Sequence, residues 1–461
     1  MVAAVLTTLD ALKKRFVDCS WPPAVNLARN AVLRTFSGLE VGSLLIIDEP
    51  NGMKHIFGRG FAEDRETEAK KINNAPSAEI VVKRDTFWLR LFLYADVGFA
   101  EGYMLDDFEC NDLTSFFRLF ILNRQQLNDG MTALSSLSSM LSRLGKSTNT
   151  LANSLLNTAA HYDISNDMFT AFLSKDMTYS CPIWGVMHEG RETPETLEHA
   201  QQTKLLRFIE GAKLKPSDRV LEIGTGWGSF AIEAVKRTGC RVTSVTLSQN
   251  QKQLAEKRIK LAGLGHRIEV LFMDYREIPI PAMPYDKIIS IEMIEAVGES
   301  HLAEYFASVN RLLKKDGGIA MFQCITIPEA QHAADANKRE FISQYIFPGG
   351  YLPSTMQLLN HINTQSQGTL TLERVENIGG HYVKTLRLWR ETFMLNFEEK
   401  IKPALLESYP SMSDESVEIF RRKWEYYFAY CEAGFFTKTL GDVIITVGRA
   451  GNMELLEGIS H

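Results

Sequence analysis

One stretch near the middle of the chain, residues 220–230, constrains the fold more than any other. Three apolar residues and Glu222 predict a buried strand, and residues 229–236 predict a helix. Between them, Gly224, Gly226 and Gly228 form a G-x-G-x-G turn. Glycines are needed where the backbone bends sharply and a ligand approaches without a Cβ in the way. The stretch therefore predicts a strand–turn–helix unit that binds a nucleotide.

The spacing of these glycines narrows the choice of ligand. It differs from the dinucleotide fingerprint G-x-G-x-x-G in its last interval, which disfavours a pyrophosphate. A compact, cationic nucleoside such as S-adenosylmethionine (SAM) suits the turn better, and Glu222 then lies near its ammonium group. Another nucleotide, or a purely structural turn, is the alternative at this point.

Alternating strands and helices surround this turn. The pattern predicts helices at 197–212, 229–237, 249–262 and 301–313, and strands at 220–223, 241–247, 268–272, 286–291 and 318–325. This alternation is typical of an α/β fold with a doubly wound, mostly parallel sheet. Ligands of such sheets bind at the carboxyl ends of the strands. The loops expected there are 224–228, 246–251, 274–275, 292–295 and 323–326.

Residues before about 126 have a different pattern and predict a small α+β domain. We expect strands at 42–47, 53–58 and 78–83, and helices at 1–35, at 85–94 and from Asn111 or Asp112 onward. Aromatic residues are frequent in the two later helices. We interpret them as an ordinary core, with an apolar groove or membrane-docking face for lipid tails as the alternative.

The chain of 461 residues is long enough for two domains. Residues 127–157 are rich in Ser, Asn, Leu and Thr and predict a linker. We therefore expect an N-terminal domain at 1–126, a linker at 127–157 and a second domain at 158–461. An insert at 328–360 interrupts the alternation, and its apolar residues suit a lid or a substrate wall.

Composition excludes several classes of protein. A net charge of −6 without a long basic run argues against nucleic-acid binding. The six cysteines include no C-x-x-C pair, so no metal or redox motif is expected and a reducing compartment is the simple interpretation. The first residues do not form a convincing signal peptide, and no apolar run approaches the roughly 18 residues of a membrane span. A cytoplasmic protein is expected.

A set of short motifs resembles the cyclopropane-fatty-acyl-phospholipid synthases and the related mycolic-acid cyclopropane synthases. The matching segments are 161–163 with 166–167, 179–181, 221–228, 246–251, 292–295, 347–350, and 380–382 with Thr385, Leu386 and Trp389. Residues 38–125, best at 98–104, resemble more weakly the N-terminal domain of the phospholipid-acting members. The resemblance implies a Rossmann-like class I SAM-dependent methyltransferase domain preceded by a small α+β domain.

The resemblance also implies a reaction, in which a methylene passes from SAM to the cis double bond of an unsaturated phospholipid acyl chain. The sulfonium makes the methyl electrophilic, and methyl transfer to the alkene leaves a carbocation. Loss of a proton from the new methyl closes the ring, and the family uses a bound bicarbonate as the base. Such a site must be dry, apolar and able to stabilise positive charge.

Residue roles follow from the matched positions. The resemblance implies a bicarbonate site and catalytic groups at Cys181, Glu295, Gln323, Ile325 and Tyr382, with His161 nearby. Gln323 departs from the family, where many members have His, so this anion site has a donor that cannot be charged. The implied SAM-binding residues are Tyr179, Ser180, Glu222, Gly224, Thr225, Gly226, Gly228, Thr246, Leu247, Gln251 and Tyr275. Arg276 is left out because it reverses the charge of the family's residue.

Each catalytic candidate also has a structural interpretation. Cys181 alone would be a small buried hydrophobe, and His161 a capping or core residue. Glu295 would be solvated or paired, and Tyr382 would pack beneath a helix. Their joint occurrence on family positions, at strand ends, favours the functional interpretation.

Competing functions stay open alongside the synthase. The same cation could give a methyl- or methylene-branched chain. A small-molecule N-methyltransferase shares much of the motif set, and the N-terminal domain argues against it. A lipid-binding protein with a vestigial SAM site is the non-enzymatic alternative. Peripheral membrane contact and a homodimer are further expectations from the resemblance.

Overall fold

The computed structural model describes residues 22–58, 75–127, 165–185, 195–335 and 341–456. Contacts divide the chain into two compact units. The first contains residues 1–163, 338–348 and 405–437, and the second contains 164–337, 349–404 and 438–461. Two segments that we expected in the second domain therefore group with the first unit. The expected linker lies, apart from residue 127, outside the described residues.

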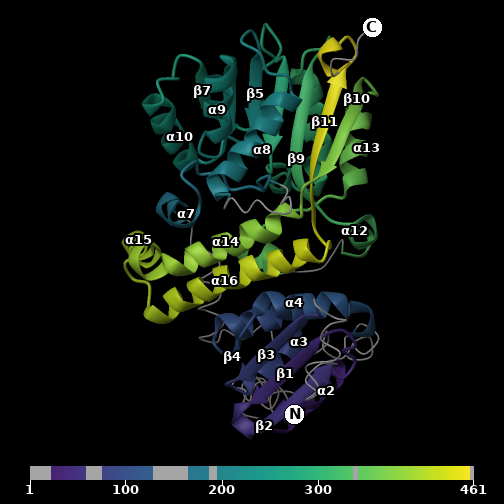
Figure 1. Ribbon diagram of the computed structural model, residues 1–461, viewed down its shortest axis with the longest axis vertical. Coiled ribbons are helices and arrows are strands. Elements are labelled where there is room, and N and C mark those ends of the chain that lie inside the picture. The colour runs from purple at the N-terminus through teal and green to yellow at the C-terminus, as the bar shows by residue number, and fades with distance from the viewer. Residues whose placement is uncertain (1–21, 59–74, 128–164, 186–194, 336–340, 457–461) are drawn as a thin grey trace, which may run out of the picture. The chain divides into compact units, whose positions relative to one another are not determined.

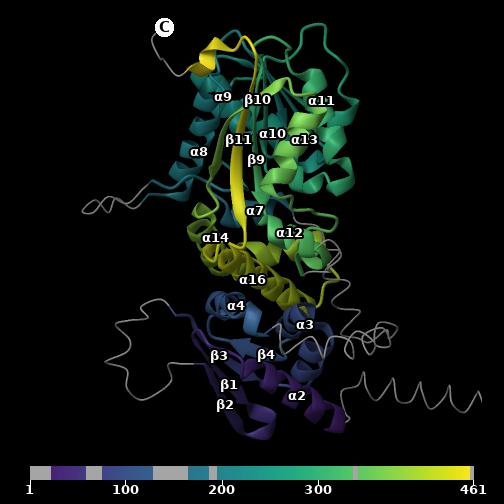
Figure 2. The same cartoon turned by 90° about the vertical axis from the view of Figure 1, so that its right-hand side faces the viewer.

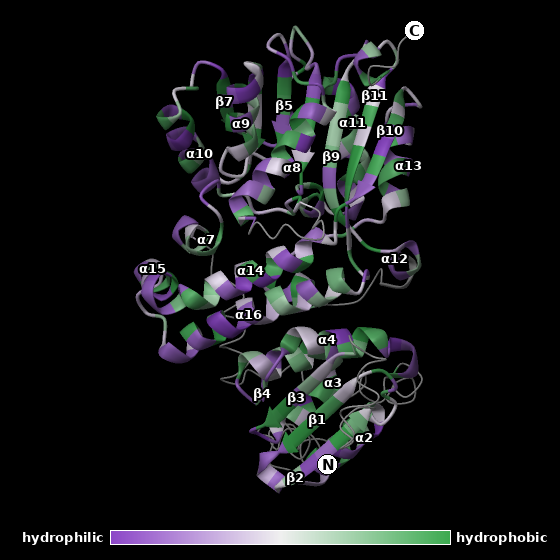
Figure 3. Ribbon diagram, in the orientation of Figure 1, coloured by the Kyte–Doolittle hydropathy of each residue, from purple (hydrophilic) through white to green (hydrophobic). Residues whose placement is uncertain are grey.

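The first unit contains a four-stranded sheet (Figure 1). Its strands, in spatial order, are β2 (Met53–Gly58), β1 (Ser43–Asp48), β3 (Ser77–Val82) and β4 (Phe108–Cys110). β1 pairs antiparallel with β2 and parallel with β3, and β3 pairs antiparallel with β4. Its helices are α2 (Pro22–Phe36), α3 (Thr86–Met104), α4 (Leu113–Leu122) and α16 (Asp414–Phe436). Figure 3 shows hydrophobic residues concentrated on β1 and β3.

Helix α3 is longer than its sequence pattern predicts. It continues past Tyr94 to Met104 across a kink at Ala95, whose φ is 49°. Gly98 makes this kink possible, because a Cβ there would lie 2.0 Å from the carbonyl oxygen of Arg90. Of the two predicted caps of the next helix, α4, Asp112 is the one used: its side chain accepts a hydrogen bond from the backbone N–H of Ser115.

Aromatic side chains of α3 and α4 form the core of the first unit. Phe87, Trp88, Phe116 and Phe117 are buried. Phe99 stacks on Phe116 with 4.3 Å between ring centroids. These contacts support the core interpretation for these residues rather than an open groove.

The second unit contains the seven-stranded sheet that the alternation predicts. In spatial order its strands are β10 (Leu370–Asn377), β11 (Gly441–Arg449), β9 (Ile319–Thr326), β8 (Lys287–Ile291), β5 (Arg219–Ile223), β6 (Arg241–Thr246) and β7 (Ile268–Phe272). The five strands from β9 to β7 are parallel, and β11 runs antiparallel to β9 and β10. A doubly wound, mostly parallel α/β sheet is thereby confirmed.

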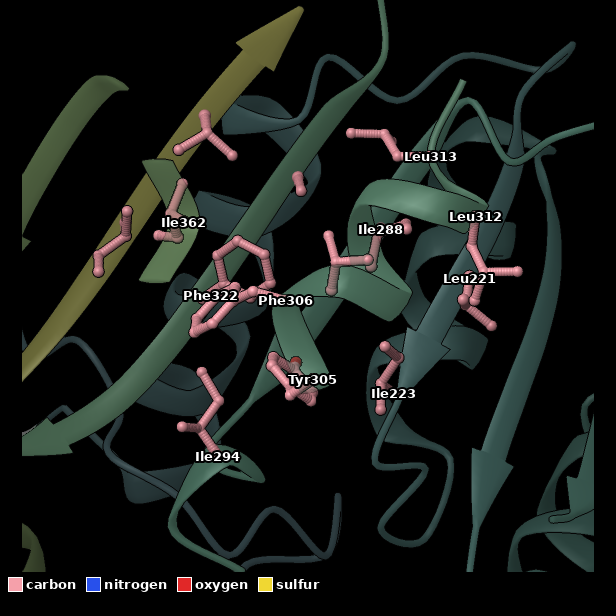
Figure 4. Packing of buried hydrophobic residues seen from close by; sticks show 14 of the residues in the cluster. Leu221, Ile223, Ile288, Ile294, Tyr305, Phe306, Leu312, Leu313, Phe322 and Ile362 are labelled. Atoms are coloured by element: carbon pink, nitrogen blue, oxygen red, sulfur yellow. The ribbon is translucent and has the colours of Figure 1, made fainter. Parts of the chain in front are cut away.

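Helices cover both faces of this sheet. They include α8 (Leu197–Gly211), α9 (Ser229–Thr238), α10 (Gln249–Leu261), α11 (Leu302–Leu312) and α13 (Thr355–Gln365), whereas α14 (His381–Leu395) contacts α7 (Asn166–Phe172). Figure 2 shows α8 on one face and α11 and α13 on the other. Figure 4 shows the core on the second face, where Phe306 of α11 packs against Phe322 of β9 in a cluster that also contains Leu221 and Ile288. The central strands are mostly apolar because helices bury both faces, and Glu222 and Gln323 are among their few buried polar residues.

The insert at 328–360 is not a structureless loop. It contains α12 (Glu329–Asp335), a π-helical turn at Ile342–Ile346 and the start of α13. Its residues 338–348 group with the first unit. Among the described residues, no helix has the length and apolar character needed to cross a membrane.

Candidate functional site

The glycine turn lies at the carboxyl end of β5, as predicted. Gly224, Gly226 and Gly228 have φ values of 101°, 51° and 83°, which disfavour residues with a Cβ. The backbone N–H groups of Gly224 and Thr225 donate to the carbonyl of Val245 on β6. No heavy atom of the described chain lies within 4 Å of where a Cβ on Gly226 would be. The turn is therefore held to the sheet on one side and open on the other.

Glu222 lies beneath this turn rather than on its open side. It is buried, and Ser244 Oγ on β6 donates to its Oε2 at 2.5 Å. Ser244 Oγ also lies 2.6 Å from Thr225 Oγ1. Burial raises the pKa of Glu222 to about 8. The carboxyl ties β5, β6 and the turn together, and its contact with a ligand's ammonium group stays a prediction.

A short helix, α7 (Asn166–Phe172), contacts the turn at Trp227. Trp227 Nε1 donates to Asn166 Oδ1 at 2.8 Å, and the rings of Phe169 and Trp227 are 4.9 Å apart. Asn166 Nδ2 donates to the carbonyl of Asn250 at the start of α10. Our SAM-site prediction missed Asn166, although the motif match included it.

The remaining candidates for SAM binding line two further loops. Thr246 Oγ1 donates to Gln251 Oε1 at 3.0 Å, and Leu247 between them is exposed. Tyr275 packs edge-on against Tyr305, with 5.2 Å between ring centroids. Arg276 is paired with Asp274 at 2.7 Å.

The segment 179–181 lies against α8. The ring of Tyr179 packs against those of Phe169 and Trp389. Ser180 Oγ accepts a hydrogen bond from Lys204 Nζ at 2.5 Å, and both residues are buried. These contacts fix the backbone N–H of the next residue, Cys181, which points at a carboxylate.

That carboxylate belongs to Glu292, the first residue after β8. Its Oε1 accepts hydrogen bonds from the Cys181 backbone N–H and from Gln323 Nε2, each at 2.7 Å. Its Oε2 accepts one from the Tyr382 hydroxyl at 2.5 Å. Three groups that we predicted to hold bicarbonate therefore converge on one side chain of the protein.

Two more carboxyls adjoin Glu292. Asp442, at the start of β11, accepts from Gln323 Nε2 at 2.8 Å and shares a hydrogen bond with Glu292. Glu295 accepts from the Ile325 backbone N–H at 2.6 Å. Asp442 and Gln323 are fully buried, whereas Glu292 and Glu295 are only partly buried.

Burial and mutual repulsion distribute the protons among these carboxyls. Burial, then the charge of Glu292, raises the pKa of Asp442 well above its usual range. Burial raises the pKa of Glu292, but hydrogen bonds from Cys181 and Tyr382 and the ammonium of Lys204 oppose the rise. Asp442 therefore carries the shared proton, and Glu292 carries the charge. Burial, then the same charge, raises the pKa of Glu295 to about 8.

The Cys181 thiol is not set up as a nucleophile. It is fully buried, and burial raises its pKa well above the ordinary thiol value. Its side chain behaves as the small buried hydrophobe of the structural interpretation, while its backbone N–H serves the cluster. His161, the remaining catalytic candidate, lies outside the described residues.

The arrangement does not fit a bicarbonate ion at the predicted position. Glu292 already engages the Cys181 N–H, Gln323 and Tyr382, and a second anion would face its charge at close range. The Ile325 backbone N–H, at another position that the resemblance assigned to the bicarbonate site, is likewise engaged, because it donates to Glu295 Oε1. Sequence reasoning missed Glu292, Asp442 and Lys204. The position of Glu292 directly after a strand was the available signal.

What remains is a site with two neighbouring parts. An open glycine turn follows β5, and a carboxylate of raised pKa follows β8, its parallel neighbour. Such a carboxylate, largely shielded from water, can accept a proton and stabilise a nearby cation. Within the part of the chain that the structure describes, no group of His, Cys, Asp and Glu side chains could hold a metal ion.

Comparison with known proteins identifies the family and several relatives of this chain. Residues 149–444 match the model of the family described as mycolic acid cyclopropane synthetase. The tuberculostearic acid methyltransferase UfaA1 of Mycobacterium tuberculosis is 35% identical over 370 residues, which cover 78% of this chain and 80% of that protein. The cyclopropane-fatty-acyl-phospholipid synthase of Escherichia coli is 32% identical over 367 residues, 79% of this chain and 86% of that protein.

Solved structures agree with the sequence comparisons. The mycolic acid cyclopropane synthase CmaA1, in complex with SAH and CTAB, has a TM-score of 0.52 and 26% identity to this chain. The alignment covers 64% of this chain and 98% of CmaA1. The chain therefore belongs to the mycolic acid cyclopropane synthetase family and is a SAM-dependent methyltransferase of the cyclopropane synthase type.

Proposed function

We propose that this protein adds a one-carbon unit from SAM to the cis double bond of an unsaturated phospholipid acyl chain, forming a cyclopropane ring. The observation that carries this proposal is the pairing of two turns on adjacent strands. One turn is open for a nucleoside, and the other presents a largely buried carboxylate. An alkene acceptor needs no activating base before methyl transfer, but the resulting cation needs a base and an anionic neighbour.

The glycine turn and its surroundings would hold SAM. Gly226 leaves open space, and Thr246, Gln251 and Tyr275 come from the neighbouring strand ends. Asn166 braces Trp227 within the turn. When bound, SAM supplies an electrophilic methyl group on its sulfonium.

The residues of the second turn would act on the acyl chain. Tyr382 presents an aromatic ring and a hydroxyl that is bonded to Glu292, so it can face a cation while fixing the carboxylate. The buried surroundings exclude water, which would otherwise trap the cation as an alcohol. The bicarbonate expected from the resemblance has no part in this proposal, because Glu292 engages its donors.

A phospholipid substrate is supported by the extent of the similarity. The match to the Escherichia coli cyclopropane-fatty-acyl-phospholipid synthase covers 79% of this chain, more than the second unit alone provides. The CmaA1 alignment also extends beyond the second unit but covers less of the chain, 64%. We therefore propose that the first unit takes part in engaging lipid, in a peripheral contact with the membrane, and that the protein is cytoplasmic. Flotation with phospholipid vesicles tests the contact, and light scattering tests the expected homodimer.

A second product is favoured by one observation. The relative with 35% identity is named a tuberculostearic acid methyltransferase, so a methyl- or methylene-branched chain from the same cation is the alternative. The N-methyltransferase alternative has weaker support, because coclaurine N-methyltransferase shares 18% identity at a TM-score of 0.55 and indicates the fold alone.

The test is incubation with methyl-labelled SAM and vesicles of monounsaturated phospholipid, followed by mass spectrometry and proton NMR of the acyl chains. A gain of one methylene with upfield ring protons supports the synthase. The same mass with vinylidene protons moves the function to branching. Label on added amines, with none in lipid, would overturn the lipid proposal. Gly226→Val, which fills the open side of the turn, is the negative control.

A further inference from the structure

Glu292 is held in a backbone conformation that few side chains adopt. Its φ is 46°, in the left-handed region where glycine is the usual residue. A glutamate there carries backbone strain. The surrounding contacts over-determine this conformation, since they come from a loop, a strand and a helix: Cys181, Gln323 and Tyr382.

The contacts of Glu292 form an anion-binding set. A backbone N–H, an amide N–H and a phenol hydroxyl all donate to one carboxylate, and the Asp442 carboxylic acid adds a fourth hydrogen bond. This is the coordination that a small free oxyanion would require. Lys204 is fully buried nearby, where burial lowers the pKa of its ammonium and the charge of Glu292 opposes that change.

Exposure distinguishes the members of the cluster. Asp442 is fully buried and keeps its proton, so it cannot reach a substrate or accept a further proton. Glu295 also has a raised pKa, to about 8, which keeps it largely protonated at neutral pH. Glu292 alone among the three combines partial exposure with four stabilising hydrogen bonds.

We propose that the Glu292 carboxylate is itself the base of the reaction, occupying the anion position that a bicarbonate ion would otherwise fill. Turnover by this protein is then independent of bicarbonate. This inference rests on the proposed function, because it names the base for the acyl-chain reaction.

The proposed step balances as follows. The π electrons of the acyl double bond form a C–C bond to the methyl carbon while the C–S bond of the sulfonium breaks, leaving a carbocation and the neutral thioether. Glu292 then removes a proton from the new methyl group, and the C–H electron pair forms the third bond of the ring. The proton resides on the Glu292 carboxyl and is released to solvent before the next turnover.

Glu292→Gly is the decisive variant, because glycine suits the φ of 46° and vacates the donors. In buffer stripped of carbon dioxide, we expect wild-type turnover to change less than twofold when bicarbonate is added. Glu292→Gly should be at least about 100-fold slower without bicarbonate, in line with loss of a general base, and should recover at least about tenfold with it. A wild-type requirement for bicarbonate would overturn the proposal.

Two variants control this experiment. Glu292→Gln keeps the side-chain volume without the charge, so its loss should not be rescued by bicarbonate. Gln367→Gly relieves a similar backbone strain (φ 56°) at an exposed position, and its turnover with and without bicarbonate should equal that of the wild type. Activity of Glu292→Gln within tenfold of the wild type contradicts the assignment.

A binding measurement separates this inference from the proposed function. Bicarbonate should raise the melting temperature of Glu292→Gly, and ¹³C NMR should show labelled bicarbonate binding to that variant but not to the wild type. Failure of the folded variant to bind bicarbonate would overturn the claim that Glu292 occupies an anion position. If binding follows this pattern while the wild type modifies no lipid, the proposed function fails and the anion position stands.

Discussion

Two turns at the carboxyl ends of neighbouring strands both contain residues with positive φ, but they use different residue types there. After β5, the chain turns through Gly224 and Gly226, with φ values of 101° and 51°. After β8, it turns through Glu292, with a φ of 46°. The turns are in contact, since a Cβ on Gly224 would lie 3.1 Å from the side chain of Met293.

The difference shows how one sheet edge can hold both a ligand and a reactive group. A glycine adopts positive φ without strain and leaves space, so the β5 turn is suited to an incoming nucleoside. A glutamate adopts the same conformation only with strain and fills the space with a carboxylate. The first turn therefore has room for a ligand, whereas the Glu292 side chain fills the space at the second.

The largest expected effect comes from replacing a carboxyl by an amide in the pair formed by Glu292 and Asp442. Glu292→Gln should lower kcat by about 10²–10⁴-fold, because it removes the base. Asp442→Asn should cost less than tenfold, because Asp442 is already protonated and an amide can still donate to Glu292. Single-turnover kinetics with labelled SAM measure both. The opposite ranking would make Asp442 the base.

The acidic groups beside the two turns should respond to pH in the same way. Glu222 below the first turn and Glu295 after the second have a pKa of about 8, raised from 4.5 by burial. The folded chain therefore holds both protons more tightly. This contribution to stability is complete below pH 4.5 and is lost as the pH rises to 8, by about 1.4 kcal/mol per pH unit for each group.

Urea unfolding between pH 5 and 8 tests that expectation. Glu295→Gln should abolish the contribution of Glu295 to the pH dependence of the free energy of unfolding. Glu222→Gln should abolish the contribution of Glu222 and leave that of Glu295 unchanged. If Glu295→Gln leaves the pH dependence of the free energy of unfolding unchanged, Glu295 is ionised in the folded chain.

Filling the open side of the first turn should have a smaller effect. Gly226→Val is expected to weaken SAM binding by at least about tenfold, since it combines strain with a side chain in the ligand's space. Gly263→Val is the matched control, because Gly263 also has a positive φ (72°) and no heavy atom of the described chain near its Cβ position. Isothermal titration calorimetry should find unchanged SAM affinity for the control; equal losses in both variants would assign the effect to strain alone.

The smallest effect concerns strain by itself. Gln367→Gly should raise the free energy of unfolding by about 0.5 kcal/mol, because the exposed Gln367 has only strain to lose. Glu292→Gly should gain less, since it leaves the donors on Cys181, Gln323 and Tyr382 without their acceptor. Chemical denaturation compares the two variants. A larger gain for Glu292→Gly would mean that those donors contribute nothing to the conformation of the turn.

The local sequence pattern was enough to predict most helices and strands of the second unit. The strand at 219–223, the glycine turn and the helix after it follow from apolar runs and from the rarity of positive φ outside glycine. Asp112 marked a helix start because its side chain satisfies a free N–H within three residues. Such features depend on neighbours in sequence.

The extent of α3 and the grouping of α16 did not follow from local pattern. The continuation past Ala95 requires the backbone approach that Gly98 permits. The grouping of 405–437 with the first unit depends on contacts such as that of Phe117 with Tyr426, which lie far apart in the chain. Apolar residues can be buried against any segment of the chain, however distant in sequence. An apolar pattern therefore does not identify the segment against which it packs.

The amino-acid sequence by itself determined the α/β sheet, the nucleotide turn and the edge at which the site lies. Only the tertiary structure decided which acid is at the centre of that site. Glu292 and Glu295 are three residues apart and chemically identical, but the donors on Cys181, Gln323 and Tyr382 converge on Glu292 alone. A carboxylate's charge and basicity depend on the donors and burial around it, and those come from segments that meet only in the folded chain.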